Sequence, residues 1–522
     1  MGRKVVGRRG KAKRNRNSGG SSSTQAAQCA QEFLDGLNSK AVCGPDRERP
    51  PVPDESAMQE DKVVTTEDVE FQDDEDDVEP VVDEEVVAVD CAMEEDDDDE
   101  NGDGMRTVWN PRVHGSLKEG EVLEFDSTAY TVYHSLRVEW PCLTFDHIRD
   151  TLGAVRVRPP HTLTIASGTQ AANASDNKVC LWRVSNLCTT KHDDDSDDES
   201  DDDDGDEADG KVGDQPVIVD REFAHPGSVN RLRSCPHVPA VLATWADTGR
   251  VHIWDAKHHV AALERSSPNA VFDLKPMFTF AGHSAEGFAV DWSPVVAGRL
   301  ATGDCNRGIH VWEPHESTWN VSSSAYKGHA RSVEDIQWSP SEQGVFASCS
   351  VDRSIRIWDT RTQQKSMLAV NDAHAGDVNV ISWNGTVPHL MASGSDDGSF
   401  KVWDLRAFKS GRAAGFFQWH DKPITAIQWH PTQDSVLGVT SEDDSCTIWD
   451  MSVELDREEM ALRPGAGGAD LGGVDIPPQL IFVHRGQTQI KDLRFHPQIP
   501  SLIATTAYDG FNFFKPDNLD AA

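Results

Sequence analysis

A fixed spacing between histidine and tryptophan recurs along the chain after residue 224 and restricts the folds open to it. Five histidines are each followed, twenty-nine positions later, by a tryptophan: His225–Trp254, His283–Trp312, His329–Trp358, His374–Trp403 and His420–Trp449. The last four of these tryptophans recur at nearly equal intervals of forty-five or forty-six positions. A repeat of this length is typical of β-propellers, in which each unit is one small sheet that cannot bury both of its faces alone.

Short β-rich runs end at these tryptophans, among them "RVHIW", "GIHVW", "SIRIW" and "SFKVW", and turns rich in Gly, Pro and Asp separate them. This is the WD-repeat pattern of four antiparallel strands per blade. One further unit ends at Trp182, and a last one runs from His484 to Phe513, although its "FHP" turn comes two positions late. We therefore predict an all-β fold, a seven-bladed WD-repeat β-propeller with an N-terminal α-helix and disordered acidic segments.

The repeated histidines are predicted to be structural. Three of them precede an aspartate by twenty-three positions, and the pairs are His329–Asp352, His374–Asp397 and His420–Asp443; after His283 the same position holds Asn306. In WD repeats such pairs form hydrogen bonds within the blade. We identify no nucleophile grouping, phosphate-binding loop or paired carboxylates, and therefore expect no enzymatic activity, no cofactor and no metal.

The charge of the chain favours basic partners. Lys and Arg number 49 and Asp and Glu 88, so the formal net charge is −39. Such a surface repels phosphates, and we expect no direct DNA binding. We also expect no membrane span, because no apolar run approaches the required length of about 20 residues. Ten scattered cysteines without a CxxC pair are typical of reduced thiols inside a cell.

Residues 1–104 are predicted to be a disordered tail, basic and then acidic, because they contain few large apolar side chains. Eight basic residues lie between Arg3 and Arg16 and indicate a nuclear or nucleolar address. A solvated tail and a mitochondrial transit peptide are the alternatives. The segment has too few apolar residues for an amphipathic transit helix, which favours the nuclear interpretation.

Residues 105–140 are predicted to hold an N-terminal helix and a lead-in to the propeller, which would span 141–522. An apolar stripe with steps of three, four, four and three positions runs through Val122, Phe125, Ala129, Tyr133 and Leu136. Acidic residues crowd the start of the stripe, where a helix dipole favours negative charge. The "VEWPCLTF" segment that follows is predicted to open a blade.

Two insertions interrupt the repeats. An acidic loop, 190–212, follows the first blade; thirteen of the seventeen positions from Asp193 to Asp209 are acidic, and the gap from Trp182 to Trp254 exceeds every later interval between the repeat tryptophans. Long surface loops add little closure entropy, so the propeller tolerates it. It is either a site for basic clients or a solubilising spacer. The client site would comprise Asp193, Asp194, Asp195, Asp197, Asp198, Glu199, Asp201, Asp202, Asp203 and Asp204, and Ser196 and Ser200 are candidate phosphorylation sites. A proline-bearing loop, 462–480, separates the sixth and seventh blades.

The predicted helix, "EWPCLTF" and "DIPPQLIFVHRGQTQIKDLRFHP" resemble the histone-binding WD-repeat proteins of chromatin-assembly complexes. The acidic segments, "ASGTQ" and "AYDGFNFFK" resemble one branch more closely, the glutamate-rich WD-repeat proteins of ribosome assembly. The resemblance covers roughly Met105 to Pro516. It implies a nucleolar, non-enzymatic chaperone in ribosome biogenesis, whose partners are a basic ribosomal protein of the large subunit, histones and pre-ribosomal particles.

The resemblance also implies a groove that holds a basic amphipathic helix between the N-terminal helix and the proline-bearing loop. By helical spacing we assign Val122, Phe125, Tyr133 and Leu136 to docking on the propeller. The residues predicted to face the client are Glu121, Glu124, Asp126 and Tyr130 on one wall and Asp475, Pro477, Pro478 and Leu480 on the other.

Two other functions compete with this one. The first is a histone-binding subunit of a chromatin assembly or modifying complex, which would use the same groove. The second is a substrate receptor of a cullin-type ubiquitin ligase. The segments Trp358-Asp359-Thr360-Arg361 and Trp403-Asp404-Leu405-Arg406 fit the WDxR pattern, in which Arg361 and Arg406 would contact the ligase adaptor. WDxR also arises freely in WD repeats.

Overall fold

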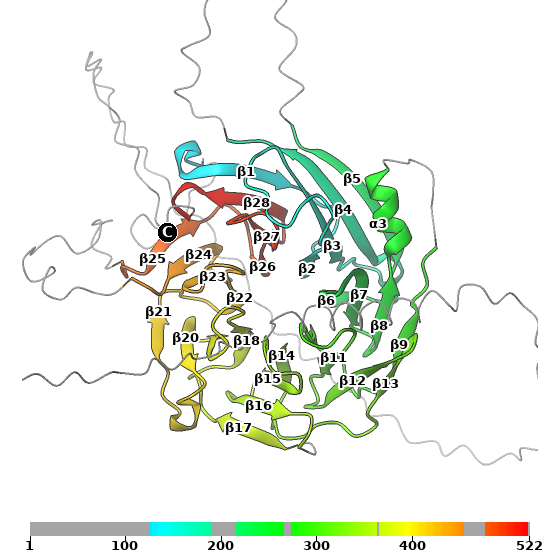
Figure 1. The fold of residues 1–522 in the computed structure, drawn as a ribbon, viewed down its shortest axis with the longest axis vertical. Coiled ribbons are helices and arrows are strands. Elements are labelled where there is room, and N and C mark those ends of the chain that lie inside the picture. Colours follow the sequence, from blue (N-terminus) through cyan, green and yellow to red (C-terminus); the bar gives the residue numbers. More distant parts are fainter. Residues whose placement is uncertain (1–124, 191–214, 266–272, 363–364, 454–475, 520–522) are drawn as a thin grey trace, which may run out of the picture. The chain divides into compact units, whose positions relative to one another are not determined.

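The computed structural model describes residues 125–190, 215–265, 273–362, 365–453 and 476–519, which belong to one compact unit of the chain. They form seven four-stranded antiparallel sheets arranged as blades in a ring (Figure 1). The predicted seven-bladed WD-repeat β-propeller is confirmed. Each blade presents one face to each neighbour, so the ring buries surfaces that a single sheet would expose.

Each blade runs from an innermost to an outermost strand in the following order. Blade 1 is β2 (Thr144–His147), β3 (His161–Gly168), β4 (Lys178–Leu187) and β5 (Val217–Ala224); blade 2 is β6 (Val229–Cys235), β7 (Val238–Ala246), β8 (Val251–Asp255) and β9 (Phe278–Phe280). Blade 3 is β10 (Ala289–Trp292), β11 (Leu300–Gly303), β12 (Ile309–His315) and β13 (Thr318–Val321); blade 4 is β14 (Val333–Trp338), β15 (Val345–Ser350), β16 (Ile355–Asp359) and β17 (Ser366–Val370). Blade 5 is β18 (Val378–Trp383), β19 (Leu390–Ser395), β20 (Ser399–Asp404) and β21 (Gly415–Gln418); blade 6 is β22 (Ile424–Trp429), β23 (Val436–Ser441), β24 (Ser445–Asp450) and β25 (Leu480–His484). Blade 7 is β26 (Asp492–Phe495), β27 (Ile503–Ala507), β28 (Gly510–Pro516) and β1 (Tyr130–Leu136).

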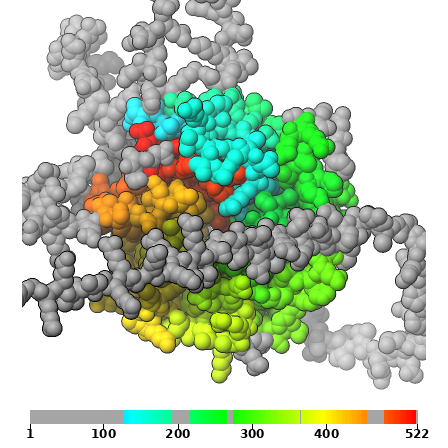
Figure 2. All heavy atoms as spheres, in the orientation of Figure 1, coloured from blue at the N-terminus to red at the C-terminus, as the bar shows by residue number. Residues whose placement is uncertain are grey.

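The N-terminal strand closes the ring. β1 pairs with β28 in an antiparallel register from Tyr130↔Pro516 to Leu136↔Phe511. Figure 2 shows the cyan N-terminal part of the described chain against the red C-terminal part on the molecular surface. The two ends of the propeller are therefore held together by backbone hydrogen bonds and side-chain packing.

The helix predicted across the apolar stripe is wrong for residues 125–136. Ser127–Ala129 form a single 3-10 turn, η2, and Tyr130–Leu136 are the strand β1. The segment "YTVYHSL" is rich in aromatic and β-branched side chains, which fit a pleated, half-buried surface. The edge of β28 supplies the backbone partners that a helix would find within itself, and the first half of the stripe lies outside the described residues.

The described part of the chain contains one α-helix, α3 (Lys257–Glu264), which packs beside β4 and β5. Further 3-10 turns are η3 (Ala174–Asp176), η5 (Phe408–Ser410) and η6 (Asp517–Leu519).

Hydrogen bonds join the innermost strands of neighbouring blades. A side-chain oxygen of one blade accepts the bond from a backbone N–H of the next; the pairs are Asp146–Ser234, Asp291–Trp338, Gln337–Trp383, Ser382–Trp429 and Gln428–Phe495, at 2.7–3.1 Å. The indoles of Trp292, Trp338 and Trp429 donate to carbonyls of the preceding blade. These tryptophans therefore fix the spacing of the blades.

The histidine of each repeat links three strands through one chain of hydrogen bonds. In blade 4, Trp358 Nε1 donates to Ser348 Oγ at 2.8 Å, and this oxygen lies 2.7 Å from His329 Nε2. His329 Nδ1 lies 3.1 Å from Asp352 Oδ2. The predicted structural role of His329 is thus confirmed, and His420 pairs with Asp443 in the same way at 2.8 Å. In blade 3 the partner of His283 is Asp304 at 3.0 Å, so Asn306 does not leave the histidine without an acid.

The predicted register of the last unit is wrong. His484 ends β25 and therefore belongs to blade 6. Gln487 takes the histidine position, because its Oε1 accepts a hydrogen bond from Thr505 Oγ1 as His329 Nε2 does from Ser348. Phe514, rather than Phe513, takes the tryptophan position, since it pairs with Ile503 as Trp358 pairs with Phe346. Counting from Gln487 also removes most of the late turn.

We expect the propeller to lose stability in mild acid. Burial lowers the pKa of His225, His252 and His374 from 6.5 to about 4. Between these pH values the unfolded chain binds more protons than the folded one, so stability falls as the pH drops from 6.5 toward 4. The loss at pH 5 should be on the order of 1–2 kcal/mol per histidine.

Thermal unfolding between pH 7.5 and pH 5 measures this effect. The matched variant is His374→Gln, because blade 7 already uses glutamine at this position. It should be less stable at pH 7.5 but show a smaller loss on acidification. An identical loss in the variant would assign the pH dependence to other groups.

Candidate partner-binding groove

Three segments singled out in the sequence leave one face of the ring in adjacent blades. In an antiparallel blade, the connections between the first and second strands and between the third and fourth lie on the same face. The proline-bearing loop connects β24 to β25 within blade 6, and the acidic loop connects β4 to β5 within blade 1. Both were predicted to lie between blades, which is incorrect. β1 is the fourth strand of blade 7, so the chain before Phe125 joins the propeller at this face as well (Figure 1).

Tyr130 connects the closing strand to the strand that follows the proline-bearing loop. Its side chain is 6% exposed, and its ring lies 5.3 Å from that of Phe482 on β25. Its hydroxyl lies 2.8 Å from His484 Nδ1, and Asn512 Nδ2 lies 3.1 Å from His484 Nε2. If the Asn512 amide donates, His484 Nδ1 carries the proton and the Tyr130 hydroxyl accepts it. Burial lowers the pKa of His484 to about 3 and raises that of Tyr130 well above its usual range.

The prediction that Tyr130 faces a client is therefore wrong, because the period of a strand differs from that of a helix and turns this side chain inward. Phe125, assigned to docking, is instead 50% exposed and rests on the ring of Tyr133 at 4.5 Å. Asp126 is exposed as predicted and caps the η2 turn, where its Oδ1 accepts from Thr128 N at 3.0 Å.

The opposite wall is described from residue 476 onward. Pro478 is exposed, whereas Pro477 and Leu480 are half-buried. Leu480 pairs with Trp449 on β24 and packs against the hydrophobic cluster between blades 5 and 6. Leu480 therefore supports the fold as well as the wall.

The C-terminal turn η6 ties the two walls together. Asn518 Nδ2 donates to the carbonyl of Ile481 on β25 at 2.8 Å. Thr131 Oγ1 on β1 donates to Asp517 Oδ1 at 3.3 Å. The sequence pattern does not mark His484, Asn512 or Asn518 as part of this site, because their contacts join segments from opposite ends of the described chain or lie in the degenerate last unit.

The chain that enters the acidic loop is fixed to β1. Thr190 N donates to the carbonyl of Thr131 at 3.0 Å, and His134 Nε2 lies 3.1 Å from the carbonyl of Cys188. The loop therefore begins beside the closing strand. Several predicted site residues lie outside the described residues: Glu121, Glu124, Asp475, the acidic residues Asp193–Asp204, and Ser196 and Ser200.

The two arginines of the WDxR segments are exposed on the same face of neighbouring blades. Arg361 follows β16 and forms a bidentate pair with Asp359, with Nε–Oδ1 at 2.9 Å and NH2–Oδ2 at 2.7 Å. Arg406 follows β20 and pairs with Asp404 with the same geometry. Each aspartate holds its arginine in a fixed direction.

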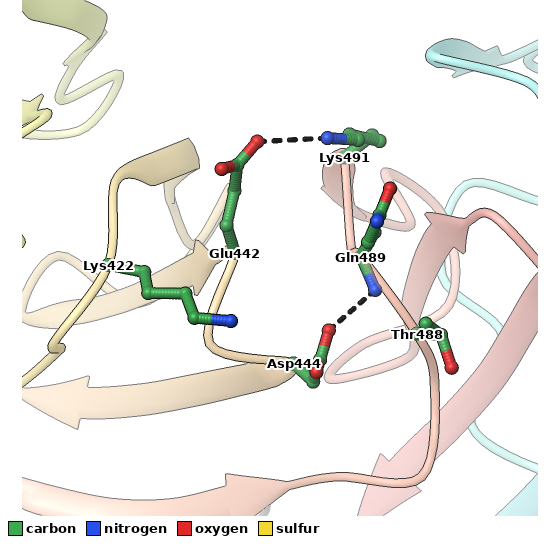
Figure 3. A pocket seen from close by; sticks show the side chains of 6 residues that line it. All are labelled: Lys422, Glu442, Asp444, Thr488, Gln489 and Lys491. Carbon is green, nitrogen blue, oxygen red and sulfur yellow. Dashed lines mark hydrogen bonds and ion pairs between the residues drawn. The ribbon is translucent and has the colours of Figure 1, made fainter. Parts of the chain in front are cut away.

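The other face carries a cleft of about 240 Å³ between blades 6 and 7 (Figure 3). Lys491 Nζ pairs with Glu442 Oε1 at 2.9 Å across it, and Gln489 N donates to Asp444 Oδ1 at 2.6 Å. Two lysines and two acids line it, so their charges balance. Among the described side chains, no group of three or more His, Cys, Asp and Glu could hold a metal ion, and no helix in this part of the chain could cross a membrane.

The ring and its repeats define a WD-repeat β-propeller, a scaffold class. Residues 320–359, 365–404 and 411–450 match the model of the WD domain, G-beta repeat. Residues 120–188, which include the closing strand and most of blade 1, match the model of the histone-binding protein RBBP4 and its counterpart in the CAF1 complex.

Whole-length relatives specify the class further. The chain is 47% identical over 420 residues to glutamate-rich WD repeat-containing protein 1 of Dictyostelium discoideum, covering 80% of this chain and 86% of the relative. It is 44% identical to protein HEAT STRESS TOLERANT DWD 1 of Arabidopsis thaliana, covering 79% and 92%. It is 38% identical to ribosome assembly protein rrb1 of Schizosaccharomyces pombe, covering 77% and 83%. The chain belongs to the glutamate-rich WD-repeat protein family, within the histone-binding WD-repeat proteins.

Proposed function

We propose that this protein is a non-enzymatic chaperone that holds basic clients during ribosome biogenesis. The observation that carries the proposal is the convergence, on one face of blades 6, 7 and 1, of the closing strand, the proline-bearing loop and the acidic loop. The relative named a ribosome assembly protein supports the process, and the histone-binding family model supports a basic client. A basic ribosomal protein of the large subunit and histones are the proposed clients, with pre-ribosomal particles as the setting.

The groove would bind the client through shape and charge together. Asp126 and Pro478 are exposed on its two walls, and we place Glu121, Glu124, Asp475, Pro477 and the exposed edge of Leu480 with them. An amphipathic basic helix can set its apolar face on such a floor and its cations against the acidic rim. The acidic loop beside β1 would raise the local negative potential and compete with RNA for the client.

A double variant on the rim tests the groove. Asp126→Asn retains a capping oxygen and removes the charge, and Pro478→Arg adds a repelling cation on the opposite wall. We expect binding of purified histone H3–H4 to weaken by about tenfold, or about 1.4 kcal/mol, with the melting temperature nearly unchanged. Isothermal calorimetry measures the affinity. The matched control is Asp421→Asn with Pro226→Arg, two exposed residues on the other face of the ring. Equal losses in the two double variants would contradict the proposed groove.

We also propose that the protein acts in the nucleus and accumulates in the nucleolus. Replacing the eight basic residues between Arg3 and Arg16 with glutamine should reduce the nuclear signal of a fluorescent fusion several-fold, because import receptors bind such clusters by charge. Replacing seven acidic residues, Glu94–Glu100, with Gln and Asn is the control. An undisturbed nucleolar signal would place the address elsewhere or on the client.

The exposed arginines Arg361 and Arg406 favour one alternative, a receptor of a cullin-type ubiquitin ligase. A histone-binding subunit of a chromatin complex is the other. Affinity purification of the full chain at two salt concentrations separates the three, since it recovers ribosomal proteins, the ligase adaptor or chromatin subunits. Loss of the adaptor with Arg361→Ala and Arg406→Ala would support the ligase role.

A further inference from the structure

One loop of blade 1 presents an apolar surface that the proposed function does not use. Residues 149–160 connect β2 to β3, and Leu152, Val155 and Val157 are 51%, 68% and 62% exposed. Ten large apolar side chains are exposed among the described residues, so three of them fall within six positions of this loop. Exposed apolar groups gathered in this way mark interaction surfaces more often than single ones do.

A clamp from blade 7 holds this loop. The side chain of the buried Gln498 accepts from Asp150 N at 3.0 Å and donates to the carbonyls of Asp150 and Gly153 at 2.9 and 2.8 Å. The carbonyl of Gln498 also accepts from Arg156 N at 2.9 Å. A partner therefore meets a preformed surface and loses less conformational entropy in ordering it.

The charge of the loop is opposite to that of the whole chain. Arg156 is occupied within the loop, since its NH1 donates to the carbonyl of Thr162 at 2.8 Å and its NH2 lies 3.0 Å from Asp150 Oδ2. Arg149 and Arg158 flank the apolar residues and are exposed. The loop thus combines three apolar side chains with two outward cations on a protein whose formal net charge is −39.

We propose that residues 149–158 are a docking surface for a partner segment that combines acidic residues with Leu- or Val-like side chains. The apolar groups would be buried against Leu152, Val155 and Val157, and the carboxylates would pair with Arg149 and Arg158. Arginine suits this role because its guanidinium binds a carboxylate with two parallel hydrogen bonds. The surface is distinct from the groove, because it lies on the connection between the two inner strands of blade 1 and selects the opposite charge.

Selection from a random twelve-residue peptide display library tests the partner's chemistry. The library is selected on the full chain and depleted on the full chain that carries Leu152→Ser, Val155→Ser and Val157→Ser. Depletion removes peptides that bind the acidic loop or the groove. We expect the remaining peptides to be enriched in Asp or Glu together with Leu, Val or Ile. The strongest one, made synthetically, should bind the triple variant at least tenfold more weakly by fluorescence anisotropy.

Two further variants separate the contributions of charge and preorganisation. Arg149→Glu with Arg158→Glu should weaken binding of the selected peptide at least tenfold, while the melting temperature of the variant stays that of the unaltered chain. Gln498→Ala keeps every exposed side chain and should weaken peptide binding by a smaller factor, because only the clamp is lost. Met367→Ser with Phe416→Ser, exposed on the outer strands of blades 4 and 5, is the matched control and should bind normally.

Several outcomes would overturn the proposal. They are a library without enrichment, enrichment in Lys and Arg, or equal binding to the triple variant. Sedimentation supplies another: if the unaltered chain dimerises at micromolar concentration and the triple variant does not, the loop binds a second copy of this chain instead.

Discussion

Replacing Tyr130 with alanine should destabilise the propeller by about 3–5 kcal/mol, the range for removing a buried aromatic side chain. The ring of Tyr130 fills the space between β1, β25 and β28, beside Phe482 and Phe514. Its loss leaves a cavity at the only place where the two ends of the described propeller are joined without a chain connection. We expect the melting temperature to drop and β1 to exchange its amide protons faster than the strands of blades 3 and 4.

Two matched variants show which property of Tyr130 matters. Tyr130→Phe keeps the ring and removes the hydroxyl beside His484, so it should cost about 1–2 kcal/mol, the range for leaving a buried polar group unpaired. Phe125→Ala removes an aromatic residue that is half-exposed and should change stability by less than about 1 kcal/mol. Hydrogen exchange with mass spectrometry and denaturant unfolding measure both effects. A Tyr130→Ala protein as stable as Phe125→Ala would show that β1 does not close the ring.

Neutralising the thirteen acidic residues of Asp193–Asp209 should weaken the binding of purified core histones by about 100-fold at low ionic strength, or about 2.7 kcal/mol. Exposed charges attract over a Debye length of about 10 Å at 0.1 M salt, and the effect is screened as salt rises. The variant should therefore also show a flatter dependence of affinity on salt. The melting temperature should not change, because the loop joins two strands of blade 1 whose hydrogen bonds are unaltered.

A comparison of equal charge tests whether position matters. Neutralising the seven acidic residues from Asp193 to Asp201 removes as much charge as neutralising Glu94–Glu100 nearer the N-terminus. The loop variant should lose more affinity, since the loop begins at Thr190 beside β1. Equal losses would mean that the loop contributes only net charge. Unchanged affinity after neutralising the whole loop would make it a spacer.

The sequence determined the fold class because its information was local. The histidine, the small hydroxyl residue and the tryptophan of a repeat contact one another within one blade, as His329, Ser348 and Trp358 do. A fixed spacing is the direct consequence of these contacts, so it appears in the chain without any alignment. The positions of Arg361 and Arg406 on one face also follow from the repeat, since each comes after the third strand of its blade.

Only the tertiary structure decided what happens where the ring closes. The segment Tyr130–Leu136 fits the periods of a helix and a strand, and the free edge of β28, at the opposite end of the described chain, selects the strand. That choice turns Tyr130 inward and leaves Phe125 at the surface. In the same blade, Gln487 and Phe514 replace histidine and tryptophan through contacts rather than identity, so spacing alone assigned His484 and Phe513. Local contacts leave a period in the sequence, whereas a contact made once between distant segments leaves none.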